Sequence, residues 1–278
     1  MSKTEKNSDE NLTGDNNLVA MAIGAHPDDI EFMMAGTLLL LKQAGAQIHV
    51  WNLATGNCGT AVHSHKEIVR LRWEEARDSA RVAGARIYPP IADDLKLFYD
   101  EASLQTVAAR IRQVKPNILL CPSPQDYMED HQNACRLAVT GAFARGMRNF
   151  PTSPAVEVWT GDTVIYHALP YGLRDGLRRR VRAGSYVGVG TVMDVKRKML
   201  SQHRTQKEWL DASQGLDAYL TTMEDMCAEI AEQAGRFEYA EGWRRHSHLG
   251  FASRESDPLA ELLGDSYWKD PEYEKSLD

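Results

Sequence analysis

Two segments far apart in the sequence carry the side chains that could do chemistry. His26-Pro27-Asp28-Asp29 follows the apolar run 18–24, and Asp130-His131 ends a loop that follows the apolar run 117–121. A short apolar run bounded by a turn predicts a buried strand. Both segments would then stand at the carboxyl end of a strand, which is the edge where an open α/β sheet places its ligands. We therefore expect them to meet in one crevice.

The residue types at this crevice indicate metal-assisted hydrolysis. His26 and His131 with one carboxylate suit a hydrolytic zinc site that leaves a coordination position for water. Asp28 and Asp29 are adjacent and cannot both point the same way, so one can bind the metal while the other accepts a proton as general base. Without a metal, the first segment would form only a turn and a helix cap, since Asp is a preferred N-cap residue.

Alternating strands and helices must position these segments. Strands are predicted at 18–24, 48–54, 85–88, 117–121 and 163–166, and the helices between them at 30–44, 66–83, 103–114 and 132–145. This alternation predicts βαβ units and a parallel sheet. The expected fold is a Rossmann-like, mostly parallel α/β sheet of order 3-2-1-4-5, flanked by helices and followed by a helical C-terminal extension. In that order strands one and four are neighbours, and the crevice opens between them.

Composition and charge narrow the class of protein. The 278 residues are 43% hydrophobic and carry a net charge of -7, which favours a globular protein and argues against a nucleic-acid partner. The four cysteines are scattered without a C-x-x-C pair, so we expect a reducing, cytoplasmic location. No apolar segment is long enough to span a membrane, so no membrane partner is expected.

Local composition divides the chain into three regions. Residues 1–17 are polar and predict a disordered N-terminal tail rather than a signal peptide. Residues 18–250 are expected to form the domain, including the C-terminal helices between 193 and about 233. Residues 251–278 are expected to form an acidic, mobile tail with Trp268 and Tyr273 as docking points.

Several motifs resemble one enzyme family. Ala25-His26-Pro27-Asp28-Asp29-x-Glu31, followed by Gly36-Thr37-Leu38, resembles the opening signature of the metal-dependent de-N-acetylases of the LmbE-like and PIG-L (N-acetylglucosaminyl-phosphatidylinositol de-N-acetylase) family. The resemblance covers residues 18–250. Its further parts are Arg72-x-x-Glu75-Ala76, the loop 126–131, Lys198-x-x-x-x-His203-x-Thr205-Gln206 and Tyr239-Ala240-Glu241-Gly242-Trp243.

The resemblance implies a role for each matching residue. His26, Asp29 and His131 would bind the metal, which would be Zn²⁺ or another divalent ion. Asp28 would be the catalytic base that activates water and later protonates the amine, and Arg72 would help hold the substrate. The implied reaction removes an N-acetyl group from an amino sugar such as N-acetylglucosamine, or from a sugar-derived amine. The resemblance also implies a homo-oligomer with a small-molecule N-acylated substrate as its partner.

One position departs from the family pattern. Met128 stands where the resemblance implies a histidine that stabilises the oxyanion, and a thioether cannot donate a hydrogen bond. We therefore expect Tyr127, His167 or one of His63 and His65 to supply the donor, and we place Tyr127, Met128 and His167 at the substrate.

Other functions stay open on sequence grounds. The chain could be an amidase for a non-sugar N-acyl compound, or a metal-bearing ligand-binding protein whose catalysis is impaired by Met128. A nucleotide-binding sheet is disfavoured because no G-x-G-x-x-G follows the first strand. The arginine cluster within 174–182 is either a solvated face, a subunit contact or an anion site.

Overall fold

A central sheet organises the computed structural model, which describes residues 18–214 and 218–278. In these residues the strands are β1 (Val19–Gly24), β2 (Gln47–Asn52), β3 (Arg86–Ile87), β4 (Ile118–Cys121), β5 (Val164–Ala168), β6 (Ser185–Gly188), β7 (Ala240–Arg245) and β8 (Tyr267–Lys269). Their order in the sheet is β3-β2-β1-β4-β5-β7-β6-β8. The first five strands are parallel. The Rossmann-like prediction of order 3-2-1-4-5 is therefore confirmed for this half of the sheet.

The other half of the sheet is antiparallel and was not predicted. β7 pairs antiparallel with β5 and with β6, and β6 pairs antiparallel with β8. The sequence of β7 contains Glu, Gly and two Arg residues, which have little intrinsic preference for a strand. Pairing with β5 and β6 and burial of its first four residues hold this segment extended.

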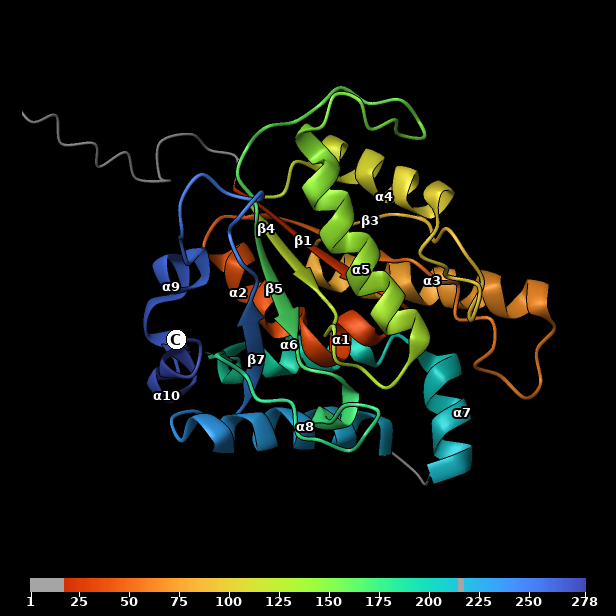
Figure 1. The fold of residues 1–278 in the computed structure, drawn as a ribbon. Coiled ribbons are helices and arrows are strands. Elements are labelled where there is room, and N and C mark those ends of the chain that lie inside the picture. Colours follow the sequence, from red (N-terminus) through yellow and green to blue (C-terminus); the bar gives the residue numbers. More distant parts are fainter. Residues whose placement is uncertain (1–17, 215–217) are drawn as a thin grey trace, which may run out of the picture.

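Helices cover both faces of the sheet (Figure 1). They are α1 (Asp29–Met33), α2 (Ala35–Gln43), α3 (His65–Ala83), α4 (Glu101–Val114), α5 (Glu129–Phe143), α6 (Met193–Leu200), α7 (Arg204–Gln214), α8 (Ala218–Ala234), α9 (Pro258–Leu263) and α10 (Pro271–Lys275). The single helix expected at 30–44 is divided at Met34, whose φ of -136° is not helical. The helical extension after residue 193 is confirmed in α6, α7 and α8.

Side chains alternate along the strands and create two cores. Met21 and Ile23 of β1 pack with α4 and α5, whereas Ala20 and Ala22 pack with residues of α1, α2, α6 and α8. This follows from the period of two along a strand, which sends neighbouring side chains to opposite faces. The two cores fix the strands on both sides and hold their carboxyl ends in place.

Residues 251–278, expected as a mobile tail, are packed onto the fold instead. They contain α9, β8 and α10, and β8 extends the sheet beside β6. Trp268 stacks against Tyr186 with ring centroids 5.5 Å apart, and the Tyr273 hydroxyl accepts a hydrogen bond from Arg244 Nε at 3.0 Å. Trp268 and Tyr273 are thus in contact with the domain. The acidic composition of this segment predicted a mobile tail, because composition does not show that β8 pairs with β6. The predicted tail at 1–17 lies outside the described residues.

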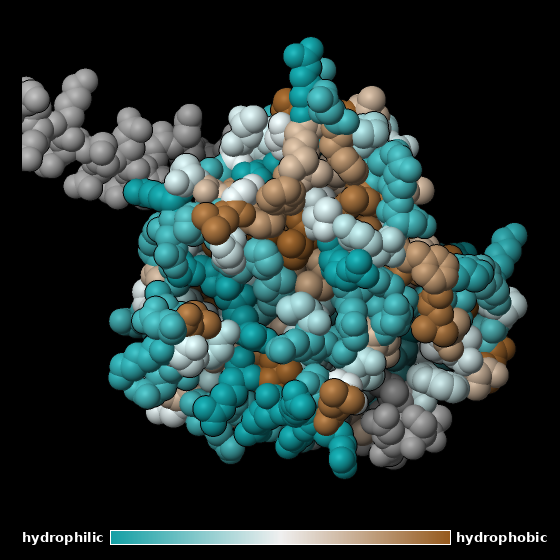
Figure 2. Space-filling view, viewed as in Figure 1, coloured by the Kyte–Doolittle hydropathy of each residue, from teal (hydrophilic) through white to brown (hydrophobic). Residues whose placement is uncertain are grey.

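The surface is mixed in character. On the face shown in Figure 2 most side chains are hydrophilic, with apolar ones in smaller groups among them, as is usual for a globular protein. Among the described helices, none is long and apolar enough to cross a membrane.

Candidate active site

The two segments singled out by the sequence meet as expected. β1 and β4 are paired neighbours, so the chain that leaves β1 and the loop that leaves β4 come out beside each other. His26, Asp29 and His131 each offer a ligand atom, and these atoms all lie within 4.8 Å of one another. His131 Nε2 lies 3.3 Å from Asp29 Oδ1, and the two imidazole rings are 5.4 Å apart between centroids.

A carboxylate orients each imidazole from behind. His26 Nε2 lies 3.0 Å from Asp130 Oδ2, and His131 Nδ1 lies 3.1 Å from Asp126 Oδ2. The opposite nitrogens, His26 Nδ1 and His131 Nε2, are left to face Asp29 at 3.9 and 3.3 Å. Metal-binding histidines generally donate their second ring N–H to a carboxylate or carbonyl in this manner, which fixes the tautomer. The arrangement therefore fits a metal bound by His26, Asp29 and His131.

Electrostatics also fit a cation at this place. Burial lowers the pKa of His131, but the carboxylates of Asp29 and Asp126 raise it by more, so the net pKa lies well above the usual value. Burial raises the pKa of Asp29, yet His131, His26 and the backbone lower it further, so this carboxylate is ionised. Its Oδ2 accepts hydrogen bonds from the backbone N–H groups of Ala25 (2.9 Å) and His26 (2.8 Å). The surplus of carboxylates around the two rings favours a divalent ion.

Asp28 lies beside this ligand set in a different environment. Its backbone has φ 116°, a conformation that costs a non-glycine residue about 1–3 kcal/mol. The residue is 8% exposed, and its side chain accepts a hydrogen bond of 2.9 Å from the Tyr219 hydroxyl. Burial raises the pKa of Asp28 to about 6, although the guanidinium of Arg72, 3.8 Å away, lowers it. A carboxylate of this kind can exchange a proton near neutral pH.

A cavity of about 400 Å³ opens over these residues. His26, Asp28, Asp29 and His131 lie in its wall together with apolar residues of α1. Ligand cavities for small molecules commonly have volumes of about 300 to 1,000 Å³. The site can thus receive an organic substrate next to the ligand set.

Most of the predicted substrate-binding residues line this cavity. Tyr127 and Met128 stand in its wall, and the Tyr127 and His131 rings are 6.0 Å apart between centroids. Arg72 also lines it, but its Nη2 donates to the Pro27 carbonyl at 2.6 Å and its Nη1 donates to Gln206. Arg72 therefore braces the turn that presents Asp28.

The structure places His167 elsewhere, which corrects its expected position at the substrate. His167 is paired in register with Cys121 on the neighbouring strand, and its ring lies against the sulfurs of Cys121 and Cys135. His63 and His65 also do not line the cavity, and His65 instead pairs with Asp93 at 3.1 Å. Of the four proposed hydrogen-bond donors, only Tyr127 stands where a substrate could reach it.

Sequence reasoning missed several residues that shape the site. Asp126 and Asp130 carried a signal, since both are acidic and lie within five residues of His131. Gln206 carried only its place in the C-terminal motif 198–206 of the resemblance, and Tyr219 carried no signal, because both come from helices far along the chain that pack back over the cavity. His203, which belongs to the same C-terminal motif as Gln206, is fully buried, and its Nε2 lies 3.2 Å from Glu31 Oε1.

Comparison with known proteins agrees with this geometry. Residues 21–143 match the family described as PIG-L, GlcNAc-PI de-N-acetylase. Over 194 residues the chain is 27% identical to the diacetylchitobiose deacetylase of Thermococcus kodakarensis (strain ATCC BAA-918 / JCM 12380 / KOD1), and this alignment covers 67% of the chain and 69% of that protein.

Solved structures share the fold. The N,N'-diacetylchitobiose deacetylase from Pyrococcus horikoshii has a TM-score of 0.71 at 20% identity and matches 87% of this chain and 88% of its own. GalB, the 4-carboxy-2-hydroxymuconate hydratase from Pseudomonas putida KT2440, has a TM-score of 0.68 at 21% identity. The match covers 86% of this chain and 98% of the GalB chain. Deacetylases and a hydratase therefore share one architecture, and the activity must be argued from the site.

Proposed function

Residues 21–143 match the PIG-L family, and the chain is homologous to a diacetylchitobiose deacetylase. From this premise we propose that the protein is a metal-dependent N-deacetylase. One observation carries the proposal. A two-histidine, one-carboxylate set stands beside a second, buried carboxylate, Asp28, in the wall of the same cavity. A protein that only binds a metal or a ligand has no need of a base in that place.

Zn²⁺ is the proposed metal, held by His26, Asp29 and His131. Two imidazoles and one carboxylate are a common hydrolytic zinc set. When bound, the cation would supply Lewis acidity, which lowers the pKa of water to about 7 and polarises an amide carbonyl. Asp126 and Asp130 would keep the two imidazoles in the tautomers that the metal requires.

Asp28 would move the proton. It accepts one from the attacking water and then gives it to the amine that leaves, so that the acetyl group departs as acetate. The Tyr219 hydroxyl and the Arg72 guanidinium hold this carboxylate in position from two sides. Because Arg72 also binds the Pro27 carbonyl, the orientation of Asp28 and the shape of its turn are fixed together.

Tyr127 would donate the hydrogen bond that Met128 cannot. Burial, with Asp126 and other nearby carboxylates, raises the pKa of Tyr127, so its hydroxyl keeps its proton at neutral pH. The ring lies in the cavity wall beside His131. A neutral hydroxyl in that position can stabilise the negative charge that develops on the carbonyl oxygen.

The substrate proposed is an N-acetylated amino sugar or a sugar-derived amine, which the names of the deacetylase relatives favour. A cytoplasmic location is proposed as well, because Cys58, Cys121, Cys135 and Cys227 are all free thiols. The homo-oligomer remains a prediction from the family resemblance.

Release of acetate from N-acetylglucosamine and diacetylchitobiose by the zinc-loaded protein tests the proposal. Asp28→Asn should keep its zinc and lose turnover by about 10² to 10⁴, the usual contribution of general acid–base catalysis. Asp162→Asn is the matched control, since Asp162 pairs with Ser253 on the surface and does not line the cavity. Undiminished turnover in Asp28→Asn would refute the role of this base. Binding of these sugars without acetate release by the wild-type protein would refute the activity.

A further inference from the structure

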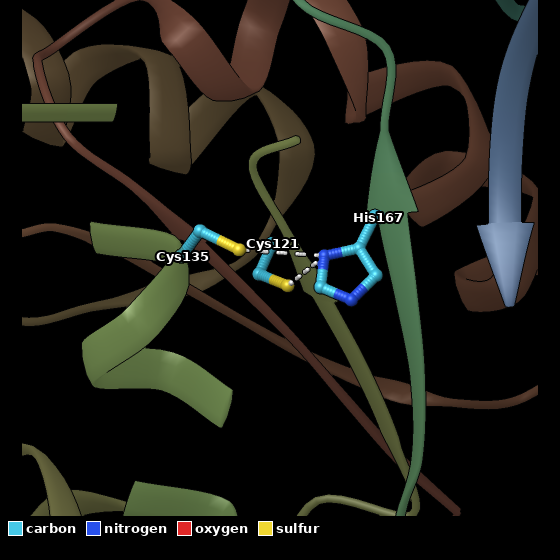
Figure 3. A group of neighbouring side chains, drawn as sticks. All are labelled: Cys121, Cys135 and His167. Atoms are coloured by element: carbon cyan, nitrogen blue, oxygen red, sulfur yellow. Dashed lines mark hydrogen bonds between the residues drawn. The ribbon is translucent and has the colours of Figure 1, made fainter. Parts of the chain in front are cut away.

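A second cluster of metal-compatible side chains lies apart from the proposed active site. Cys121 ends β4, Cys135 lies on α5 and His167 lies on β5 (Figure 3). Both sulfurs point at the same ring nitrogen, with His167 Nδ1 3.3 Å from Cys121 Sγ and 3.5 Å from Cys135 Sγ. All three residues are buried, and their ligand atoms lie within 4.8 Å of one another.

The spacing of these atoms suits a tetrahedral cation. Zinc bonds to sulfur at about 2.3 Å and to nitrogen at about 2.0–2.1 Å, so a tetrahedral site separates the sulfur and nitrogen ligands by about 3.6 Å. The two observed separations, 3.3 and 3.5 Å, are close to this value. A small inward or outward movement of the side chains would admit the ion.

The imidazole of His167 is oriented from behind. Its Nε2 lies 2.9 Å from His246 Nδ1, and burial together with His167 lowers the pKa of His246, which favours the neutral acceptor. With Nε2–H donating to His246, the Nδ1 of His167 presents a lone pair to the two sulfurs. In the other tautomer Nδ1–H donates to the Pro122 carbonyl, 3.1 Å away. Binding of a cation to Nδ1 would select the tautomer in which the proton is on Nε2.

The thiols are also prepared to lose a proton. A hydrogen bond from Cys121 and the nearby His167 imidazole lower the pKa of Cys135 to about 6 despite its burial, whereas the pKa of Cys121 is raised well above its usual value. The thiolate is the form that binds metals.

We propose that Cys121, Cys135 and His167 form a second cation site, specific for a thiophilic ion such as Zn²⁺. Thiolate and imidazole ligands select such ions over magnesium and calcium. Cys135 and His167 line a separate cavity of about 390 Å³, through which an ion can enter and water can complete the coordination. Cys121 and Cys135 stand on either side of the segment 122–131, which comprises the loop 122–128 and the start of α5, so the bound ion fastens the segment that carries His131.

Cobalt distinguishes this site from the proposed active site, because only the second site contains sulfur. A His26→Ala/His131→Ala variant titrated with Co²⁺ should bind one equivalent per chain and show a thiolate-to-cobalt charge-transfer band. Cys121→Ser/Cys135→Ser in that background should lose the band. Cys58→Ser is the matched control and should keep it, since Cys58 is exposed and outside the cluster.

Absence of the band from the folded His26→Ala/His131→Ala protein, or its survival in the double serine variant, would overturn the proposal. If the serine variants do not fold, zinc X-ray absorption of the His26→Ala/His131→Ala protein decides the question. Two sulfur scatterers at about 2.3 Å are expected. A shell of nitrogen and oxygen alone would show that the thiols do not bind the ion.

Discussion

Replacement of Asp126 by asparagine should weaken zinc binding at the proposed active site without removing a ligand. Asp126 Oδ2 lies 3.1 Å from His131 Nδ1, while its Oδ1 accepts a hydrogen bond of 3.0 Å from the Met128 backbone. Asparagine has the same shape but only one acceptor oxygen and no negative charge, so it cannot accept from both the His131 Nδ1–H and the Met128 N–H, and charge-assisted hydrogen bonds are about twice as strong as neutral ones. Partners of this kind typically contribute a factor of 10 to 100 to metal affinity, which is about 1.4 to 2.8 kcal/mol.

The measurement is the zinc dissociation constant, obtained by competition with a chromophoric chelator. Asp130→Asn gives a second test, since Asp130 stands behind His26. The two carboxylates act on different imidazoles of one site, and the double variant measures how strongly their effects on zinc binding are coupled. Asp162→Asn, on the surface, should bind zinc like the wild type. Neither Asp126 nor Asp130 hydrogen-bonds to the sulfur cluster in the described residues, so the sulfur ligands themselves are unchanged in every protein compared.

Two results would refute this reasoning. Dissociation constants within twofold of the wild type for both variants would show that the carboxylates do not tune the imidazoles. A loss in Asp126→Asn as large as that in His131→Ala would show that Asp126 is itself a ligand, which its position behind the ring does not predict.

Two further predictions follow from individual contacts. Tyr127→Phe should lower kcat for acetate release by about 10² to 10³ with little change in KM, the usual loss of one oxyanion donor; an unchanged kcat would mean that another group donates. Glu241→Gln should lower the free energy of unfolding by about 3–5 kcal/mol in urea, because it leaves the fully buried Lys196 without its charge partner. Lys196→Met combined with Glu241→Gln should recover the part of this loss that comes from the unpaired charge, although not the part that comes from the Gly36 and Thr37 backbone N–H groups, which both donate to Glu241. A double variant no more stable than the single one would contradict that account.

The parallel half of the sheet and the meeting of His26, Asp29 and His131 could be predicted from the sequence for one physical reason. Short apolar runs such as 18–24 and 117–121 must be buried, and a buried parallel sheet aligns their carboxyl ends. His26 and His131 follow those ends directly or after one loop, so topology alone brings them together. Their positions depend on strand order and not on details of packing.

Features that depend on the direction of a side chain, or on contacts between residues far apart in the chain, could not be predicted from the sequence. His167 was expected at the substrate, but strand alternation turns its ring toward α5 and Cys135, and a shift of one residue would have reversed that. The family resemblance pointed to Lys198, which is exposed, whereas Lys196 is buried against Glu241 of β7. Residues two apart on a helix do not share a face, so only the packed structure shows which lysine is paired.

The same topology that builds the proposed active site also explains why a second cluster lies so near it. The loop 122–128 begins immediately after Cys121 and leads into α5, where Cys135 follows His131 by four residues. Residues four apart on a helix project from the same face, one turn from each other. An ion bound between Cys121 and Cys135 would therefore tie the end of β4 to the first turns of α5. Since Asp126, Asp130 and His131 all lie on the segment between those two points, an ion at the proposed sulfur site would restrict the movement of all three beside the substrate cavity.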